Sequence, residues 1–541
     1  MHVSNEESNM AATYGAPGVY IEERPSGSMP LQGVGTAVAA FVGFTAAYHA
    51  EAGDPADPDG VKPQLVTSWP QYERIYGGFA PGILLPHAVK GFFENGGSTC
   101  YIVRIPAPDG AERPRRVLVS GGKQEIETLT VEALDPGVNC EVVIEPPAPP
   151  AEGEEPAGGE FTLKVVEDGQ VREDYPAVGL GRGQRGVEKL VNGHSKLIRV
   201  EVHNVPGTAL ADRLPAPGRY PIEPAAPAAA SVSPQEFEGS EAARTGYSGL
   251  AVADTVSMVA IPDLITLATR DDGSFDDEVY LAAQGRLVDW CERSRTKMAI
   301  LDAPPGLDAQ RALEWRSALG KDSAFGAAYY PHLVVPNPLT RPGSTNGDRF
   351  LTVPPSGHVA GVWARTDGSR GVWKAPANEV CRGVARLAND VTDGEQDLLN
   401  PAQVNCIRSF GANGIRVWGA RTLAATDQSW RYINVRRLFI FIEETIRRGT
   451  QWVVFEPNDS DLWARVRRTV AAFLHGLWMQ GALVGATPDQ AFYILCDESN
   501  NPESSVSEGK LVVDVGLAPV KPAEFVVFRI SQWQGGAATS E

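Results

Sequence analysis

The chain has 541 residues, of which 43% are hydrophobic, and it is too long for a single hydrophobic core, so we expect roughly three to four domains. Its formal net charge of -19 at pH 7 disfavours a general affinity for nucleic acid or for an anionic membrane surface. Any basic surface is therefore local.

Terminal and cysteine patterns favour a protein made and assembled in the cytoplasm. The first ten residues carry two glutamates and no apolar core, unlike a signal peptide. The most apolar stretch, Val34 to Ala47, is shorter than the roughly 18 to 20 residues that span a bilayer, so we expect no membrane insertion. The six cysteines lack a CxxC pair, which favours buried thiols in a reducing compartment over metal or redox sites.

Residues 1–35 are expected to form an N-terminal arm. Within them, closely spaced glycines and prolines surround a short extended run, Val19 to Ile21. This run predicts a strand that has no obvious partner nearby in the sequence, although termini are usually either frayed or tied down.

An α/β domain is predicted for residues 36–105, continued by residues 241–399. Apolar runs typical of buried, mostly parallel strands alternate there with amphipathic helical patterns, which implies a doubly wound sheet with right-handed crossovers. The strand patterns cover residues 36–45, 98–105, 257–264, 297–304 and 327–335, and the helical patterns cover residues 68–78, 84–97, 276–294 and 307–320.

Residues 106–240 change to short alternating runs, which predict an antiparallel β-rich domain inserted into the α/β domain. These runs cover residues 127–134, 140–146, 160–169 and 197–203. A Pro-rich acidic stretch at 146–159 predicts a mobile surface loop, and a breaker-rich stretch at 214–234 ends the region.

Residues 400–520 predict a C-terminal α/β domain with two long helices around a strand at 451–455. We expect Asn434 to cap the first helix, Gly449 to end it and Asp459 to begin the second. Residues 408–468 hold 11 arginines and 6 acidic residues, which makes them the only sizeable basic block.

No catalytic, cofactor or metal residue is predicted. GRGQRG at 181–186 matches GxGxxG, but no convincing helix follows it, so a flexible loop is the favoured interpretation. His358, Asp263 and Asp302 would suit a hydrolase, yet no GxSxG nucleophile or HExxH motif accompanies them. We expect a structural histidine at 358, and a helix cap or turn contact at Asp302.

Long motifs throughout the chain closely resemble those of contractile tail sheath proteins of phages and of phage-tail-like contractile injection systems. The resemblance covers both termini and the α/β portions but not residues 106–240. Its motifs are YGAPGVYIEE (14–23), VAAFVGFT (38–45), GGSTCYIVRI (96–105), PPSGHVAGVWARTD (354–367), RGVWKAPAN (370–378), NPAQVNCIRSFGANGIRVWGARTL (400–423), WRYINVRRLFIFIEETI (430–446) and FRISQWQGG (528–536).

The resemblance implies a structural role in a machine rather than an enzyme. Sheath subunits stack as sixfold rings or a six-start helix around an inner tube and rearrange into a shorter, wider state that drives the tube forward. It implies a subtilisin-like α/β domain without a working catalytic triad, and an outward-facing insert. The implied partners are copies of the same chain, an inner tube protein, baseplate and tail-terminator or cap proteins, and an AAA+ ATPase of the same system, with no nucleic acid.

The resemblance also assigns linking strands to the two ends, because an edge strand can pair with another subunit by β-augmentation. The N-terminal strand would comprise Gly18, Val19, Tyr20, Ile21 and Glu22. The C-terminal strand, within an arm at 521–541, would comprise Phe525, Val526, Val527, Phe528, Arg529 and Ile530. The alternative is that residues 13–30 form an edge strand of their own domain.

A helix that faces the inner tube should carry charge opposite to the tube surface, which gives the basic block a candidate role. Its members are Arg436, Arg437, Arg447, Arg448, Arg465, Arg467 and Arg468. Alternatively, Arg447 and Arg448 only complement their helix C-terminus. Three functions stay open at this point: an injection-system sheath, a phage virion tail sheath and a subtilisin-like hydrolase, and the particle is either retained in its producer or released.

Overall fold

The computed structural model describes residues 31–49, 57, 59–106, 115–121, 126–134, 140–146, 159–167, 170–181, 183–203, 210–222, 232–270, 272–340 and 349–529. By contacts the chain divides into two compact units. One unit contains Ile446–Gln480 and Gly485–Leu517, and the other contains Gly33–Thr445, Gly481–Val484 and the segment from Ala518 onward.

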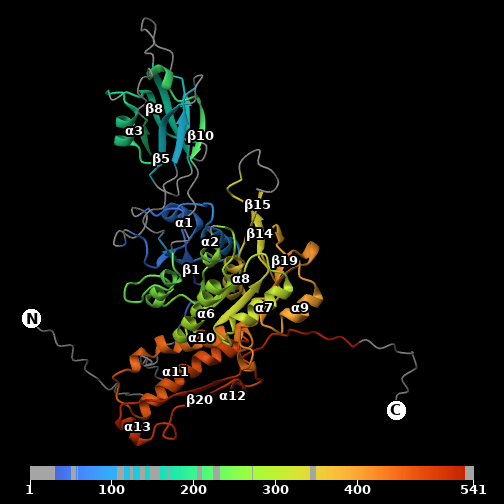
Figure 1. Cartoon of the computed structure of the whole chain (residues 1–541). Coiled ribbons are helices and arrows are strands. Elements are labelled where there is room, and N and C mark those ends of the chain that lie inside the picture. Colours follow the sequence, from blue (N-terminus) through green and yellow to red (C-terminus); the bar gives the residue numbers. More distant parts are fainter. Residues whose placement is uncertain are drawn as a thin grey trace, which may run out of the picture. The chain divides into compact units, whose positions relative to one another are not determined.

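The larger unit is built on a nine-stranded sheet with the order β16-β19-β18-β13-β12-β11-β1-β3-β2. Figure 1 labels β1 and β19 of this sheet. The six strands from β18 to β3 run parallel, and β16, β19 and β2 pair antiparallel at the edges. The predicted α/β rhythm is therefore confirmed. The strands are β1 (Ala39–Gly43), β2 (Gln64–Val66), β3 (Cys100–Arg104), β11 (Met258–Ala260), β12 (Met298–Asp302), β13 (Gly326–Tyr330), β16 (Glu379–Val380), β18 (Val404–Ser409) and β19 (Ile415–Val417).

Helices and a small side sheet complete this α/β part. Helices α6 and α8 both pack on β12, and α8 packs closely on α2. The predicted strand at 327–335 is broken into β13 and β14, and β14 pairs with β15 and β17 in a separate sheet. The bounds are α1 (Trp69–Tyr76), α2 (Leu85–Glu94), α4 (Pro234–Glu238), α5 (Leu264–Ala268), α6 (Asp277–Ser294), α7 (Ala309–Leu319), α8 (Ser356–Arg370), α9 (Asp393–Leu399), β14 (Leu333–Pro336), β15 (Phe350–Val353) and β17 (Arg386–Leu387).

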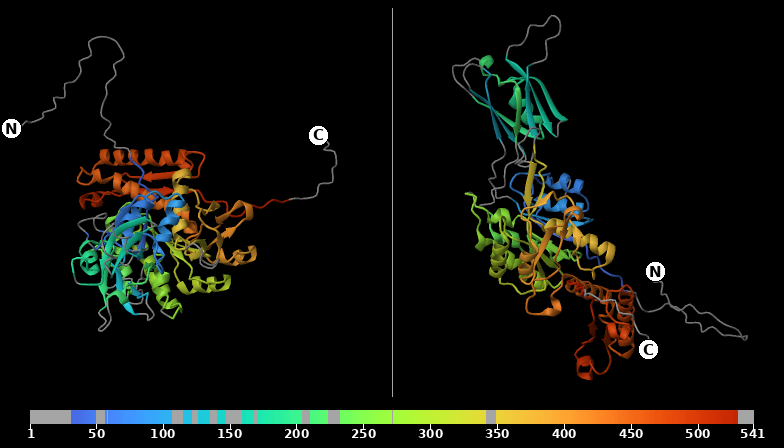
Figure 2. Two further views of the ribbon diagram at one scale, coloured as in Figure 1. Left: turned by 90° about the horizontal axis from the view of Figure 1, so that it is seen from above. Right: turned by 90° about the vertical axis from the view of Figure 1, so that its right-hand side faces the viewer.

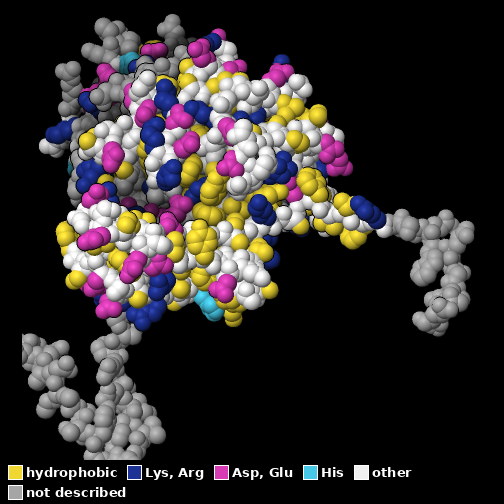
Figure 3. All heavy atoms as spheres, turned by 90° about the horizontal axis from the view of Figure 1, so that it is seen from below, with side chains coloured by type: hydrophobic (Ala, Val, Ile, Leu, Met, Phe, Trp, Pro, Cys, Tyr) yellow, Lys and Arg dark blue, Asp and Glu magenta, His cyan; other side chains and the backbone are white. Residues whose placement is uncertain are grey.

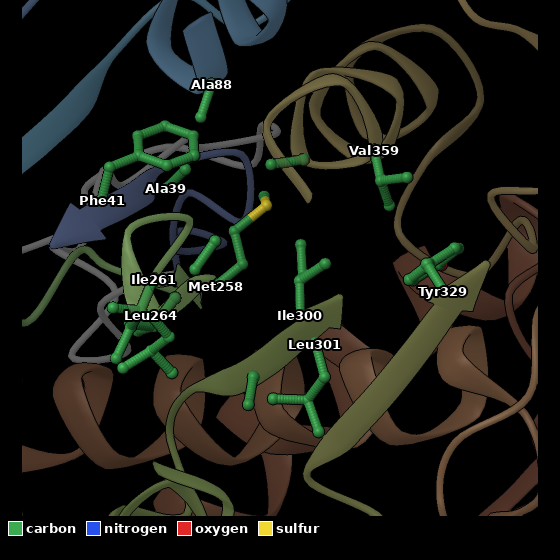
Figure 4. Close-up of a cluster of buried hydrophobic side chains, with 14 of the residues drawn as sticks. Ala39, Phe41, Ala88, Met258, Ile261, Leu264, Ile300, Leu301, Tyr329 and Val359 are labelled. Atoms are coloured by element: carbon green, nitrogen blue, oxygen red, sulfur yellow. The ribbon is translucent and has the colours of Figure 1, made fainter. Parts of the chain in front are cut away.

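The core of this part lies on both faces of the parallel strands. Successive residues of a strand point to opposite faces, so the apolar run Met298–Leu301 of β12 indicates a sheet covered on both sides. Ile300 points to the side on which Val359 of α8 lies, and Leu301 points to the other side (Figure 4). All five residues of β12 are buried, as are all five of β1.

The described residues between 115 and 222 form antiparallel sheets with their own hydrophobic cluster, inside the range 106–240 predicted for an insert. The end of that range belongs to the α/β part instead, because Phe237 of α4 is buried in the α/β cluster. A three-stranded sheet β4-β5-β9 and a four-stranded sheet β10-β6-β7-β8 contribute to that cluster together. Strand β10 lies inside the stretch that looked like a breaker-rich end. The elements are β4 (Arg115–Val119), β5 (Glu127–Ala133), β6 (Cys140–Glu145), β7 (Glu160–Glu167), β8 (Gln170–Gly179), α3 (Val187–His194), β9 (Ile198–Val202) and β10 (Gly218–Ile222).

The C-terminal region differs from the predicted domain at 400–520. Strands β18 and β19 belong to the central sheet, so residues 400–417 are part of the α/β fold. Residues 451–455 form a 3₁₀ turn at Gln451–Val453 instead of a strand, and Phe455 is fully exposed at a φ of 70°. Asn434 lies inside α10 rather than capping it, whereas Asp459 caps α11 as predicted.

The smaller unit is a helical layer on a hairpin. Helix α11 lies alongside the antiparallel pair β20 and β21 in both views of Figure 2. Buried Leu462, Val466 and Val470 form part of the apolar face of α11. The elements are α10 (Ile433–Gly449), which begins in the larger unit, α11 (Ser460–Met479), α12 (Pro488–Ala491), β20 (Phe492–Leu495), α13 (Glu503–Ser507) and β21 (Asp514–Leu517).

Candidate functional site

The two aspartates that stood out at strand ends cap helices. Asp302 accepts a hydrogen bond from the Ser356 backbone N–H at 2.8 Å, at the first residue of α8. Asp263 accepts from the N–H groups of Leu84 and Leu85 at the start of α2, and from that of Phe44. Carboxylates stabilise helix N-termini because several N–H groups there lack intrahelical partners. Burial raises the pKa of each aspartate to about 7, although these hydrogen bonds oppose the rise.

His358 lies within α8 and is packed against α2. A Cβ on Gly91 would fall 2.4 Å from Nδ1 of His358, so the two helices approach closely at this point. Burial lowers the pKa of His358 to about 4, which keeps the imidazole neutral near pH 7. Its Nδ1 has no hydrogen-bond partner among the described residues, so no carboxylate orients this nitrogen as in a catalytic triad.

The described residues of the GRGQRG stretch connect β8 to α3, in agreement with the predicted loop, but the expectation that no helix follows it is wrong. Helix α3 begins at Val187, and Gly186 is its N-cap residue. The preceding strand β8 pairs antiparallel with β7, whereas a dinucleotide site uses parallel strands joined by a helix. Arg185 forms an ion pair with Glu160 of the same sheet at 3.0 Å. Gly186 and Arg185 therefore have structural roles in the insert: one caps α3 and the other pairs with a strand of the same sheet.

Two arginines of the candidate tube-facing set lie in the interior, which corrects their assignment. Arg437 donates to both carboxylate oxygens of Asp367 at 2.8 and 2.6 Å, and both side chains are almost fully buried. Arg436 pairs with Glu443 at 2.9 Å and its guanidinium lies 4.4 Å from the Trp430 ring centre. Sequence reasoning assigned the charge to a surface because it could not see these aromatic and acidic partners.

The other five arginines keep a degree of exposure. Arg447, Arg467 and Arg468 are exposed, and Arg448 and Arg465 are half-buried. Arg465 forms an ion pair with Glu456 at 3.4 Å. Within the smaller unit, Arg467 donates to the Cys496 carbonyl at 3.1 Å and still presents its side chain to solvent. These residues remain the candidates for a charged contact surface.

The candidate C-terminal strand is extended and exposed. Phe525, Val526, Val527 and Phe528 are between 70% and 83% exposed, and no strand is assigned to them. Hydrophobic side chains gather along this segment up to the point where the described residues end (Figure 3). Four consecutive exposed apolar residues are costly in water, so this segment is suited to a contact with another chain. Ile530 lies outside the described residues.

The segment just before these residues, 518–524, is fixed to the larger unit. The Val484 N–H donates to the Ala518 carbonyl at 2.8 Å, and the Val520 N–H donates to the Ala482 carbonyl at 3.3 Å. Glu524 accepts two hydrogen bonds from the Arg421 guanidinium, at 2.8 and 2.7 Å. Sequence reasoning missed this ion pair, because the two residues are more than a hundred positions apart and only the fold joins them.

The candidate N-terminal strand, Gly18 to Glu22, lies outside the described residues, but the segment after it is visible. The Val34 N–H donates to the Thr445 hydroxyl at 3.2 Å. The Thr36 hydroxyl donates to Asp367 at 2.6 Å, and the Thr36 carbonyl accepts from Arg437 at 2.9 Å. Residues 34–36 therefore lie against helix α10 where the chain enters the larger unit.

The described ranges contain neither a candidate metal site nor a helix that could span a membrane. No group of three or more His, Cys, Asp or Glu side chains there could hold a metal ion. Crossing a lipid bilayer would require a longer or more apolar helix than any that these residues form. The six cysteines are free and buried, and burial raises the pKa of the Cys406 thiol to about 12.

Two family descriptions match adjoining parts of the chain. Residues 258–423 match the phage tail sheath protein central domain, and residues 425–532 match the phage tail sheath C-terminal domain. Together these matches cover about half of the chain. They include the parallel strands from β11 onward, both long helices and the exposed C-terminal segment.

Known proteins give the same assignment. The tail sheath protein of Vibrio phage KVP40 is 29% identical over 33% of this chain and 26% of its own length, and that of Enterobacteria phage T4 is 25% identical over 46% and 39%. The chain thus spans well under two thirds of these relatives. A subunit of the contracted helical sheath of the anti-feeding prophage is 26% identical, with a TM-score of 0.56 over 96% of this chain and 100% of that one. The chain belongs to the family of contractile tail sheath proteins.

Proposed function

We propose that this protein is the structural subunit of the contractile sheath of a phage-tail-like injection system. The observation that carries the proposal is the match to the contracted anti-feeding prophage sheath, which covers nearly the whole of both chains. Copies of the chain would polymerise around an inner tube and contract to drive it through a target envelope. A phage virion tail sheath is the second candidate, favoured by the curated phage relatives.

Linking strands at the two ends would suit this function, because sheath subunits must stay connected while they move. An unpaired strand can add to the sheet edge of a neighbour, and its backbone hydrogen bonds persist when the flanking segments swing. We propose Phe525–Ile530 as the C-terminal linking strand and Gly18–Glu22 as the N-terminal one. The high exposure of residues 525–528 supports the first assignment.

The partners follow from the same proposal. A second solved relative is a subunit of the anti-feeding prophage baseplate, 25% identical with a TM-score of 0.54 over 96% of this chain and 99% of that one, which supports baseplate contact. We propose an inner tube protein as the partner of Arg447, Arg448, Arg465, Arg467 and Arg468, with an AAA+ ATPase and a terminator or cap protein as further partners.

We propose that the α/β part has a subtilisin-like fold that serves as scaffold and not as enzyme. Asp263 and Asp302 cap helices, and the buried His358 stays neutral, so these residues have structural roles without any substrate. The hydrolase alternative expects turnover by the purified chain, with activity lost and assembly intact in His358→Ala.

Electron microscopy of the purified full chain tests the sheath function. We expect long hollow cylinders from the full chain, and folded monomers that cannot polymerise after deletion of residues 1–25. Normal cylinders from that truncation would exclude the N-terminal linking strand, and absence of cylinders under all conditions, also with tube and baseplate, would exclude the sheath function. Neighbouring capsid genes would favour the phage tail, whereas baseplate and tube genes alone would favour the injection system.

A further inference from the structure

The C-terminal segment has two halves that differ in how they are held. Residues 518–524, which we name the arm root, bond to the chain around residues 482–484, and an isolated bridge joins Leu483 to Pro519. From Phe525 onward the side chains are largely exposed. Lys521 and Ala523 are already exposed, and Glu524 is the last described residue whose side chain is hydrogen-bonded to the larger unit.

Glu524 occupies a built carboxylate site. Its two oxygens accept from Arg421 at 2.8 and 2.7 Å, from the Asn400 side chain at 2.8 Å and from the Tyr432 hydroxyl at 3.1 Å. The side chains of Arg421 and Glu524 are 9% and 18% exposed. A bidentate pair between these groups has a fixed geometry, which a single lysine contact would not provide.

Arg421 is itself held in place by hydrogen bonds that do not involve Glu524. Its guanidinium also donates to the Asn400 carbonyl at 3.0 Å, and its backbone N–H donates to the Asn405 side chain at 2.7 Å. Burial alone would raise the pKa of Glu524, but the hydrogen bonds from Arg421, Asn400 and Tyr432 lower it overall. The carboxylate is therefore ionised at neutral pH and paired with a fixed cation.

Helix α10 contacts both the arm root at 518–524 and the N-terminal segment at 33–36. The Asn434 side chain donates to the Val520 carbonyl at 3.2 Å. Three residues further along, Arg437 donates to the Thr36 carbonyl at 2.9 Å and to Asp367. Residues three apart lie on one face of a helix, so one turn of α10 touches the roots of both terminal segments.

We propose that Glu524 is a positioning residue that fixes the point at which the C-terminal arm leaves the body, and that α10 couples this point to the N-terminal root at 33–36. The proposal rests on the proposed sheath function. A strand that has added to a neighbour transmits motion only if its own root does not slip. The arm then pivots at Phe525, while the Arg421 pair keeps the root in place.

A mobility measurement on the full chain tests the anchor without reference to assembly. All six native cysteines are buried, so Lys521→Cys gives one exposed site for a fluorescent or spin label. We expect Glu524→Ala to release the root and increase the detached fraction about tenfold, because a bidentate charged pair is lost. Glu524→Gln, which keeps the shape, should release it less. Label mobility equal to that of the parent in both variants would overturn the proposal.

Assembly provides the second readout. With the parent forming cylinders, we expect Glu524→Ala to remain folded, by its circular dichroism and melting temperature, and to form several-fold fewer or shorter cylinders. The matched control is Asp289→Asn, which breaks a surface ion pair with Lys321 in the same unit and should assemble normally. Normal assembly and contraction by Glu524→Ala would overturn the positioning role and leave the sheath function standing. If the parent forms no cylinders, the sheath function fails, and the label still decides whether Glu524 fixes the root.

Discussion

Asp263 and Asp302 both cap buried helices, but they use different numbers of oxygens. Oδ1 of Asp263 accepts from Leu84 and Oδ2 accepts from Phe44 and Leu85, whereas Asp302 accepts the Ser356 N–H through Oδ1. Asparagine has one acceptor oxygen, so Asp263→Asn places an amide N–H against a backbone N–H. We expect Asp263→Asn to lower the free energy of unfolding by about 1–3 kcal/mol and Asp302→Asn by less than about 1 kcal/mol.

Chemical denaturation of the two variants at one pH measures this difference. Each substitution replaces one buried carboxylate at the end of a parallel strand by an amide. Each variant is therefore a control for the loss of charge in the other. Equal losses would contradict the hydrogen-bond arrangement at Asp263.

The same aspartates give the folded protein a pH dependence. Burial raises their pKa to about 7, above the value of about 3.9 for an unfolded aspartate, so folding favours the protonated form. The resulting stabilisation is fully present below about pH 4 and is lost as the pH rises to about 7. Because Asp302→Asn cannot ionise, we expect its stability relative to the wild type to increase between pH 5 and pH 8 in urea titrations. A constant difference over that range would contradict the raised pKa.

Arg437 is a structural residue, which separates it from the exposed arginines. Removing it leaves the buried Asp367 carboxylate without its cation, although the Thr36 hydroxyl still donates to that group. We expect Arg437→Met to lower the free energy of unfolding by about 3–5 kcal/mol. The exposed Arg468 on α11 is the control, and Arg468→Met should change it by less than about 0.5 kcal/mol. If Arg437→Met lowered the free energy of unfolding by less than about 1 kcal/mol, Arg437 would not have a structural role. The double variant Arg437→Met with Asp367→Asn should recover part of the stability lost in Arg437→Met.

At the scale of elements, local patterns predicted most of the strands and helices because their periodicity reflects burial. The local hydrophobic pattern gave wrong assignments where pairing between distant segments decides whether a residue run forms a strand and to which sheet it belongs. The apolar run at 451–455 resembles a strand, but it forms a turn with Val454 and Phe455 exposed. Strand β18 was assigned to a separate domain, because nothing local indicates that Val404 pairs with Ala328 of β13. Helix α3 was missed because its N-cap residue is Gly186, which offers no side-chain cap, whereas the equally short α1 begins after Ser68 with a proline in its first turn.

The packing of α8 on α2 depends on glycines that allow close approach. A Cβ on Gly357 would lie 2.3 Å from the backbone of Ala88, whereas Gly368, near the end of the same helix, has nothing within 4 Å. We expect Gly357→Ala to destabilise the fold by several kcal/mol or to prevent folding. Gly368→Ala should stabilise it by about 0.5–1 kcal/mol, since alanine favours helix and loses less entropy.

Thermal unfolding of the two glycine variants measures both signs on one helix. Both variants replace glycine by alanine in the same helix, α8. They therefore differ mainly in the space around the new methyl group. If Gly357→Ala were as stable as the wild type, α2 and α8 would not approach as closely as the structure shows.

At the scale of the molecule, the sequence predicted the α/β fold and the short alternating strands between residues 127 and 203. The sites that depend on the assembled fold were not predictable. Arg421 and Glu524 meet only because the chain returns past β18 after α11, and the partners of Arg436 come from three separate segments. Charge composition alone therefore overestimated the number of arginines available for a partner.

The insert and the α/β part have separate hydrophobic clusters, so we expect the α/β part to fold without the insert. Among the described residues, the α/β cluster has no member between Ile105 and Val232, and the insert cluster lies between Leu118 and Ile222. Cooperative stability depends on shared burial, so two clusters without common residues should fold as separate units. We expect replacement of residues 107–231 by a flexible Gly/Ser linker of about ten residues to leave a folded protein with an unchanged main transition.

Calorimetry and electron microscopy decide this prediction together. The wild type should show a separate transition for the insert, absent from the shortened chain, and the isolated segment 115–222 should fold alone as a β domain by circular dichroism. Because the linking strands and their roots lie outside the deleted residues, the shortened chain should still form cylinders, thinner by the missing domains if the insert faces outward. A control deletion within the α/β cluster, of residues 258–268, should abolish folding. An insoluble product from the 107–231 replacement would mean that the insert stabilises the α/β part, and cylinders of unchanged width would place the insert elsewhere than on the outer surface.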